Sequence, residues 1–95
     1  MEKIYLVLRE KGTHTDNKTY YESETTICGV REDPSEASDL LKDVVKKYHP
    51  DETAIRGTYD MDTKLDTSMT FWMEDGLEDS FWIKTMLIGP EGDEY

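Results

Sequence analysis

Seven carboxylates stand close together in the chain between residues 60 and 79, and acids at this density support three kinds of chemistry. They can bind a divalent cation, they can take part in proton or phosphoryl transfer, or they can present negative charge to a basic partner. The seven are Asp60, Asp62, Asp66, Glu74, Asp75, Glu78 and Asp79. Their spacing and their neighbours discriminate between these alternatives.

The first carboxylates begin like a calcium-binding loop but do not continue as one. An EF-hand needs an oxygen ligand at its fifth position, a glycine at the sixth and a glutamate at the twelfth. Counted from Asp60, these positions hold Lys64, Leu65 and Phe71. Residues 60–63 also resemble the Asp-x-Asp-x-Thr motif of haloacid-dehalogenase-type phosphotransferases, which need an apolar parallel strand before it and a much larger α/β domain. We therefore predict a solvated turn and no metal site.

Other residue types that could carry catalysis are isolated. His14 is expected in a loop and His49 at a helix end, and the two do not have a metal-ligand spacing. Cys28 is the single cysteine, which excludes an internal disulfide and a cysteine-based zinc site, and its apolar surroundings favour a buried structural thiol. Without a positioned acid–base pair or a phosphate-cradling glycine loop, we predict a protein that is not an enzyme and has no cofactor.

The formal net charge of −11 is unevenly distributed along the chain. Residues 1–50 hold ten acids and eight bases, a balance of −2, whereas residues 51–95 hold twelve acids and three bases, a balance of −9. Such a field repels nucleic acids and anionic membranes and attracts basic proteins. We expect a basic protein partner, and neither direct nucleic-acid binding nor membrane binding.

Length and composition predict one small domain. A chain of 95 residues can build one core, and we place that domain at residues 1–90, followed by a flexible acidic tail at 91–95. Only 36% of the residues are hydrophobic, so large aromatic side chains must supply much of the buried area. The first residues lack the apolar core of a signal peptide, and we expect a cytoplasmic protein.

The order of predicted elements is ββαβββ. Residues 3–10 alternate cleanly and predict a central strand, and residues 20–30 predict a second strand antiparallel to it. Asp33-Pro34 predicts a helix start, an apolar stripe continues to Tyr48, and His49-Pro50 ends the helix. Residues 54–61 predict a third strand, and residues 69–73 and 81–87 predict a hairpin around Asp75-Gly76.

These elements predict an α+β fold, with a mainly antiparallel sheet of about five strands and one amphipathic helix packed on one face. The other face of the sheet then meets solvent or a partner, so the exposure of Trp72 and Trp82 becomes important. The seven carboxylates would extend from a rigid hairpin, where same-face positions lie about 6.6–6.8 Å apart and can imitate a phosphate backbone. We predict partner binding by all seven and by Trp72 as an apolar anchor. The alternatives are acids that serve solubility alone and a tryptophan that belongs to the core.

A resemblance adds to this interpretation. Lys-Ile-Tyr-Leu-Val at residues 3–7, Ile-Cys-Gly-Val at 27–30 and the capped helix from Pro34 are similar to small uncharacterised proteins of bacterial phages and mobile elements. The acidic second half is similar in character to phage inhibitors that mimic DNA, including anti-CRISPR and other anti-defence proteins. The resemblance implies a viral protein that inhibits a host or defence protein.

Three hypotheses follow from the sequence. The first is a phage-encoded inhibitor that occupies a basic, nucleic-acid-binding surface of a host or defence protein. The second is a small self-associating domain, a homodimer formed through the uncovered sheet face or an edge strand. The third is a protein that sequesters a small ligand or nucleotide with Lys11, Lys18 or Arg31.

Overall fold

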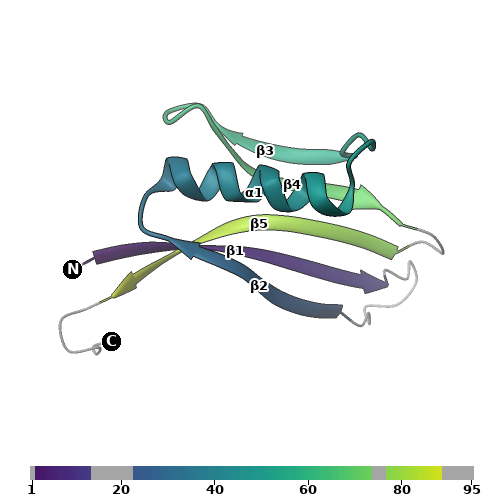
Figure 1. The fold of residues 1–95 in the computed structure, drawn as a ribbon, viewed down its shortest axis with the longest axis horizontal. Helices are drawn as coiled ribbons and strands as arrows, with labels where there is room; N and C mark the ends of the chain where they lie inside the picture. Colours follow the sequence, from purple (N-terminus) through teal and green to yellow (C-terminus); the bar gives the residue numbers. More distant parts are fainter. Residues whose placement is uncertain (1, 14–22, 74–76, 89–95) are drawn as a thin grey trace.

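The computed structural model describes residues 2–13, 23–73 and 77–88. It has the predicted α+β fold and the predicted element order ββαβββ (Figure 1). The elements are β1 (Glu2–Thr13), β2 (Ser23–Arg31), α1 (Pro34–Tyr48), β3 (Arg56–Asp60), β4 (Leu65–Trp72) and β5 (Leu77–Ile88). The predicted tail at 91–95 and the predicted turn at 75–76 lie outside the described residues.

The five strands form one antiparallel sheet in the order β2-β1-β5-β4-β3. The prediction that the first strand is central is confirmed, because β1 pairs with β2 on one side and with β5 on the other. Burial explains why its alternation is so clear. Val7 is fully buried on one face and Leu8 is buried on the other, so apolar side chains are shielded from water on both faces at the centre of this strand.

The helix begins and ends where its local sequence predicts. The Asp33 carboxylate accepts a hydrogen bond from the backbone N–H of Glu36 at 3.3 Å, and Pro34 occupies the first turn. At the other end, the N–H of His49 donates to the carbonyl of Val45 at 2.7 Å. Within the described chain, no helix combines the length and the apolar character needed to cross a membrane.

The helix lies across one face of the sheet and makes the hydrophobic core with it (Figure 1). The cluster of buried residues consists of Val7, Ala37, Leu41, Val45, Phe71 and Phe81. Its strand members Val7, Phe71 and Phe81 lie on the same face of the sheet. Phe81 pairs with Arg9 of β1 and with Met69 of β4, and Val7 and Phe71 each lie two residues from one of these partners and so share its face. Among the described elements, none covers the other face of the sheet, as predicted for a chain with one helix.

The last three strands differ in length from the prediction. β4 starts at Leu65, four residues before the predicted 69–73, and ends at Trp72, and β5 runs from Leu77 to Ile88 where 81–87 was predicted. β5 is longer because it pairs with β1 along its whole length, so backbone bonding carries it through the polar residues 78–80. β3 is shorter than predicted and covers Arg56–Asp60, with a register shift between Thr58 and Tyr59.

Candidate functional site

The predicted partner-binding residues do not form one surface, because β4 separates them into two groups. The first group lies at the β3–β4 turn and consists of Asp60, Asp62 and Asp66. The second lies at the opposite end of β4, where Trp72 pairs with Glu78 of β5. At about 3.3 Å per residue, the strand advances roughly 20 Å from Asp66 to Trp72. Glu74 and Asp75 lie outside the described residues.

At the end of β4 that carries Trp72, the structure corrects the prediction for Asp79. This carboxylate is 0% exposed, so it belongs to the core and cannot meet a partner at the surface. Its neighbour Glu78 is held by Arg56, whose Nη2 donates to the glutamate Oε1 at 2.6 Å. Trp72 is 53% exposed on the uncovered face, whereas Trp82 is half-buried. Trp72 therefore lies beside Glu78 on the uncovered face and away from the acids of the first group.

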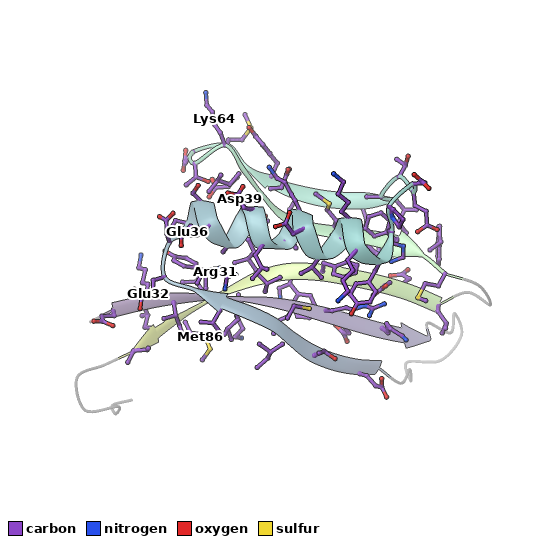
Figure 2. All side chains as sticks on the ribbon, in the orientation of Figure 1. Arg31, Glu32, Glu36, Asp39, Lys64 and Met86 are labelled. Carbon is purple, nitrogen blue, oxygen red and sulfur yellow. The ribbon has the colours of Figure 1, made fainter. Side chains whose placement is uncertain are left out.

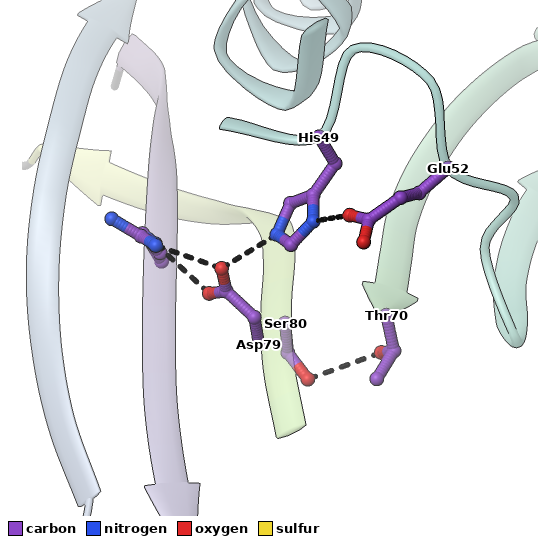
Figure 3. A network of polar contacts seen from close by, with 6 residues as sticks. His49, Glu52, Thr70, Asp79 and Ser80 are labelled. Carbon is purple, nitrogen blue, oxygen red and sulfur yellow. Dashed lines mark hydrogen bonds and ion pairs between the residues drawn. The ribbon is translucent and has the colours of Figure 1, made fainter. Parts of the chain in front are cut away.

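Asp79 is buried because a guanidinium and an imidazole bind it from two sides. Arg9 donates from Nε to Oδ1 at 2.9 Å and from Nη2 to Oδ2 at 2.8 Å. The Nε2 of His49 lies 2.7 Å from Oδ2 of the same carboxylate. The second ring nitrogen of His49 contacts the carboxylate of Glu52, and Figure 3 shows the imidazole held between the two acids. We call Arg9, His49, Glu52 and Asp79 the buried polar network.

Aromatic rings fix the geometry of this network. The imidazole of His49 stacks on Phe71 with ring centroids 4.3 Å apart and an interplanar angle of 3°. The guanidinium of Arg9 lies 3.9 Å from the ring centroid of Tyr48, at the last residue of α1. Stacking leaves the edges of both side chains free to bind carboxylates. The network thus ties the end of the helix to β1 and β5.

Electrostatics keep the central pair ionised. Burial by itself would raise the pKa of Asp79, but the hydrogen bonds from Arg9 and His49 outweigh this effect and hold the pKa below its usual value. The same hydrogen bond to Asp79 raises the pKa of Arg9. A buried carboxylate with a two-point guanidinium partner is therefore charged throughout the neutral range.

The buried polar network has few groups left for catalysis, because its members bind one another. An imidazole beside a carboxylate is a combination used in acid–base catalysis, which requires that a ring nitrogen reach the substrate. Here carboxylates engage both ring nitrogens of His49, which is 7% exposed. Among the residues that the structure describes, no group of three or more His, Cys, Asp or Glu side chains could hold a metal ion.

Sequence reasoning missed the buried polar network. Arg9 and Asp79 are 70 positions apart, and no local pattern connects them. The sequence feature that could have revealed it is Arg9. In the alternating strand, Arg9 lies on the same face as Tyr5 and Val7, which is the face that the helix covers. A buried cation requires an acid, and this condition would have directed the search to the acids of the neighbouring strands.

The exposed acids gather at the other end of β4, where the β3–β4 turn meets the first half of α1. Ser38 of the helix donates from its hydroxyl to the carbonyl of Asp66 at 3.0 Å, and Lys42 lies 3.9 Å from the Asp66 carboxylate. Figure 2 shows Glu36 and Asp39 on the helix beneath the turn that carries Lys64. We call this region the acidic end. Its carboxylates are Glu32, Asp33, Glu36, Asp39, Asp43, Asp60, Asp62 and Asp66.

A shallow hollow lies on the helix side of the acidic end. It has a volume of about 210 Å³ and is lined by Arg31, Glu36, Asp39, Leu40 and Asp43. Enclosed small-molecule sites usually measure about 300–1,000 Å³ and are mainly apolar. The hollow is smaller than these sites, and four of its five lining residues are charged, so it fits a protruding side chain of a partner better than an enclosed ligand.

The basic residues considered for an anionic ligand do not converge. Lys11 stands opposite Glu24 at one end of the β1–β2 ladder, and Arg31 stands opposite Tyr5 near the other end. Lys18, the third candidate, lies outside the described residues. The described part of the chain therefore offers no joint site for Lys11 and Arg31.

Comparison of the chain with protein-family models, with curated proteins and with solved structures found no match in any of the three.

Proposed function

We propose that this chain is a non-enzymatic binding protein whose acidic end occupies a basic surface of a partner protein, of the kind that binds nucleic acid. One observation carries the proposal. Of the eight carboxylates of the acidic end, seven are exposed, and within the described residues Asp66 alone has a salt bridge. Such a surface has negative charge that is not neutralised by salt bridges, and a basic partner would complement it.

The acids of this surface are held in a defined arrangement. Glu36, Asp39 and Asp43 follow one another at steps of three and four residues along the helix, which corresponds to about 4.5 and 6 Å along its axis. These intervals are of the same order as the charge spacing of a nucleic-acid strand, about 3.4 Å per phosphate along the duplex axis. The contacts of Asp66 with Ser38 and Lys42 fix the turn against the helix, so partner binding requires little ordering.

The resemblance to phage proteins supports a more specific proposal about the source and the target of this chain. We propose a phage-encoded inhibitor that competes with nucleic acid for a host or defence protein. In this proposal the buried polar network is structural, because it holds the C-terminal end of α1 against the sheet while the acids near the N-terminal end remain accessible. Each exposed ion pair would contribute only about 0.2–1 kcal/mol, so affinity would depend on several pairs and on fast association at low salt.

The proposal is tested by capture from a bacterial lysate on the immobilised chain at low salt. We expect a nucleic-acid-binding protein to be retained, to elute as salt is raised, and to be displaced by duplex DNA. Asp39→Lys and Asp62→Lys, each made alone, should lower retention, because both side chains are exposed in the acidic end.

Asp51→Lys provides the matched control. It changes the net charge by the same amount at an exposed position beyond the other end of α1, and it should leave retention nearly unchanged. Equal losses for all three variants would show a response to net charge alone and would refute the proposed surface. Retention that duplex DNA does not compete for would refute the mimicry of nucleic acid.

A further inference from the structure

We infer that β2 is a self-pairing edge, through which two copies of this chain join antiparallel and form one continuous sheet of ten strands. The inference does not depend on the acidic end or on its partner. It rests on the free edge of β2, on the apolar side chains exposed along it, and on a charge pattern that complements itself when the strand is reversed.

Among the described strands, β2 has a neighbour on one side only, since it is the first strand in the sheet order. Its other side presents backbone N–H and C=O groups along nine residues that contain no proline. Edge strands of this kind are templates for pairing unless charge or distortion protects them. The charged residues of β2 are Glu24 and Arg31 near its two ends, which leaves residues 25–30 without charge.

Apolar side chains are exposed on the same strand. Ile27 is 60% exposed and Val30 is 44% exposed on the sheet face that no described element covers. Behind them on β1, Leu6 pairs with Val30 and Leu8 with Ile27. A second β2 strand placed alongside would bury Ile27 against the other Ile27 and Val30 against Thr25, which removes apolar surface from water.

The register of β2 with β1 shows which side chains share a face. Glu24 pairs with Lys11 and Arg31 with Tyr5, so both charged residues of β2 point to the helix side. Ile27 and Val30 point to the uncovered side. The register shift between Val7 and Leu8 leaves Cys28 as an extra residue of β2, which forms a β-bulge. Because of this bulge, Glu24 and Arg31 lie on the same side of the sheet although they are an odd number of residues apart.

An antiparallel pair centred on Ile27 matches every face. With Cys28 of each copy left out of the pairing as the extra residue, the two Ile27 side chains meet at the two-fold axis, Thr25 faces Val30 of the other copy, and Glu24 faces Arg31 of the other copy. The interface then has two identical ion pairs, as a symmetric dimer requires. Arg31 is available for this contact, since within the described residues its hydrogen bond is to the carbonyl of Val30 and it has no salt bridge.

The other edge strand is less suited to a second copy. β3 has five residues, and its cation Arg56 is already bound to Glu78. β3 also leads directly into the β3–β4 turn with Asp60 and Asp62, so pairing there would bring acidic turns close to the partner's acids. Repulsion between two copies with a formal charge of −11 each is therefore smaller at β2, whose own charges balance.

Charge exchange across the strand tests the inference by sedimentation equilibrium. The wild-type chain should show a concentration-dependent monomer–dimer equilibrium. Glu24→Arg and Arg31→Glu should each weaken dimerisation roughly tenfold, because each replaces two attractions with two repulsions. The double variant Glu24→Arg/Arg31→Glu should restore it. Both positions are exposed, so folding is preserved. A monomer at all concentrations, or a dimer that the single reversals leave unchanged, overturns the inference.

Cross-linking tests the register separately. With Cys28→Ala as background, Ile27→Cys places a thiol at the two-fold axis, where cross-strand Cβ atoms lie about 4.5–5.5 Å apart, and oxidation should give a disulfide-linked dimer. Thr25→Cys in the same background is the matched control and should stay monomeric under denaturing conditions, because its thiol faces Val30. Equal cross-linking of both variants would refute the register, as would cross-linking of neither.

Discussion

The carboxylate of Asp79 is bound at two points by the guanidinium of Arg9, across the β1–β5 ladder and 70 positions away in the chain. The pairing partner of Arg9 on β5 is Phe81, so the arginine reaches diagonally to the residue two positions earlier. Because Asp79 is fully buried, this diagonal contact converts one acid of a strongly acidic chain into part of its core.

Replacing Asp79 with asparagine should destabilise the fold strongly. Asp79→Asn keeps the shape of the side chain but leaves Arg9, whose side chain is 17% exposed, without its counter-charge. Breaking one side of a buried pair costs about 3–5 kcal/mol, which urea unfolding would measure. The matched control is Glu78→Gln, which removes an adjacent carboxylate with an exposed partner and should cost less than about 1 kcal/mol. Similar losses for both variants would contradict the burial assigned to Asp79.

Acid should remove the stabilisation that Asp79 supplies. The pKa of Asp79 is lower in the folded chain than its usual value of 3.8, so protons bind more readily to the unfolded chain. The contribution is complete above about pH 5 and declines as the pH falls through the usual pKa and then through the lower folded pKa. The difference in unfolding free energy between wild type and Asp79→Asn should therefore be constant near neutrality and shrink in acid. A difference that does not change with pH would argue against a charged Asp79.

The two contributions of His49 can be separated by substitution. His49→Phe keeps a flat ring on Phe71 but leaves an oxygen of Asp79 without its donor, which should cost about 1–3 kcal/mol. His49→Ala loses the packing as well and should cost more, since a cavity remains beside Phe71 and Phe81. Equal costs for the two variants would show that ring packing contributes little.

Two strand glycines should differ in their tolerance of a methyl group. A Cβ on Gly57 would lie 2.7 Å from the backbone oxygen of Ser68 in β4, and the strand cannot retreat without losing its pairing. Gly57→Ala should therefore cost about 1–3 kcal/mol. A Cβ on Gly29 would meet Cδ2 of Leu40 at 2.5 Å, but this side-chain end can rotate away. Gly29→Ala should cost less, and thermal unfolding of the two variants would compare them.

Lys64 holds a strained conformation at the β3–β4 turn. Its φ of 62° lies in the left-handed region, where a side chain costs roughly 1–2 kcal/mol and glycine does not. Lys64→Gly should raise the unfolding free energy by up to about 1 kcal/mol, after the entropy of glycine in the unfolded chain is subtracted. Lys64→Ala keeps the strain and serves as the control. A gain for alanine as large as that for glycine would indicate that the lysine charge, and not the backbone, is unfavourable.

The sequence by itself determined the elements whose signals are local. Asp33 and Pro34 mark the helix start and His49-Pro50 its end, and the structure confirms both, because a helix terminus is satisfied by groups within a few residues. The alternation of residues 3–10 likewise predicted a central strand, because apolar side chains occur on both of its faces, and the structure pairs it on both sides. The antiparallel pairing of β1 with β2 and of β4 with β5 followed from their short connections, whereas the pairing of β1 with β5 was not predicted.

Only the tertiary structure decided which acids remain exposed and can meet a partner. Asp79 was predicted to meet a partner and is instead bound by Arg9 and His49, while Asp60 and Asp62 remain exposed in the acidic end. Local pattern cannot separate these cases, because the free energy of a carboxylate depends on the charges and the water around it. Its surroundings come from strands distant in sequence, and they are established only when the sheet is assembled.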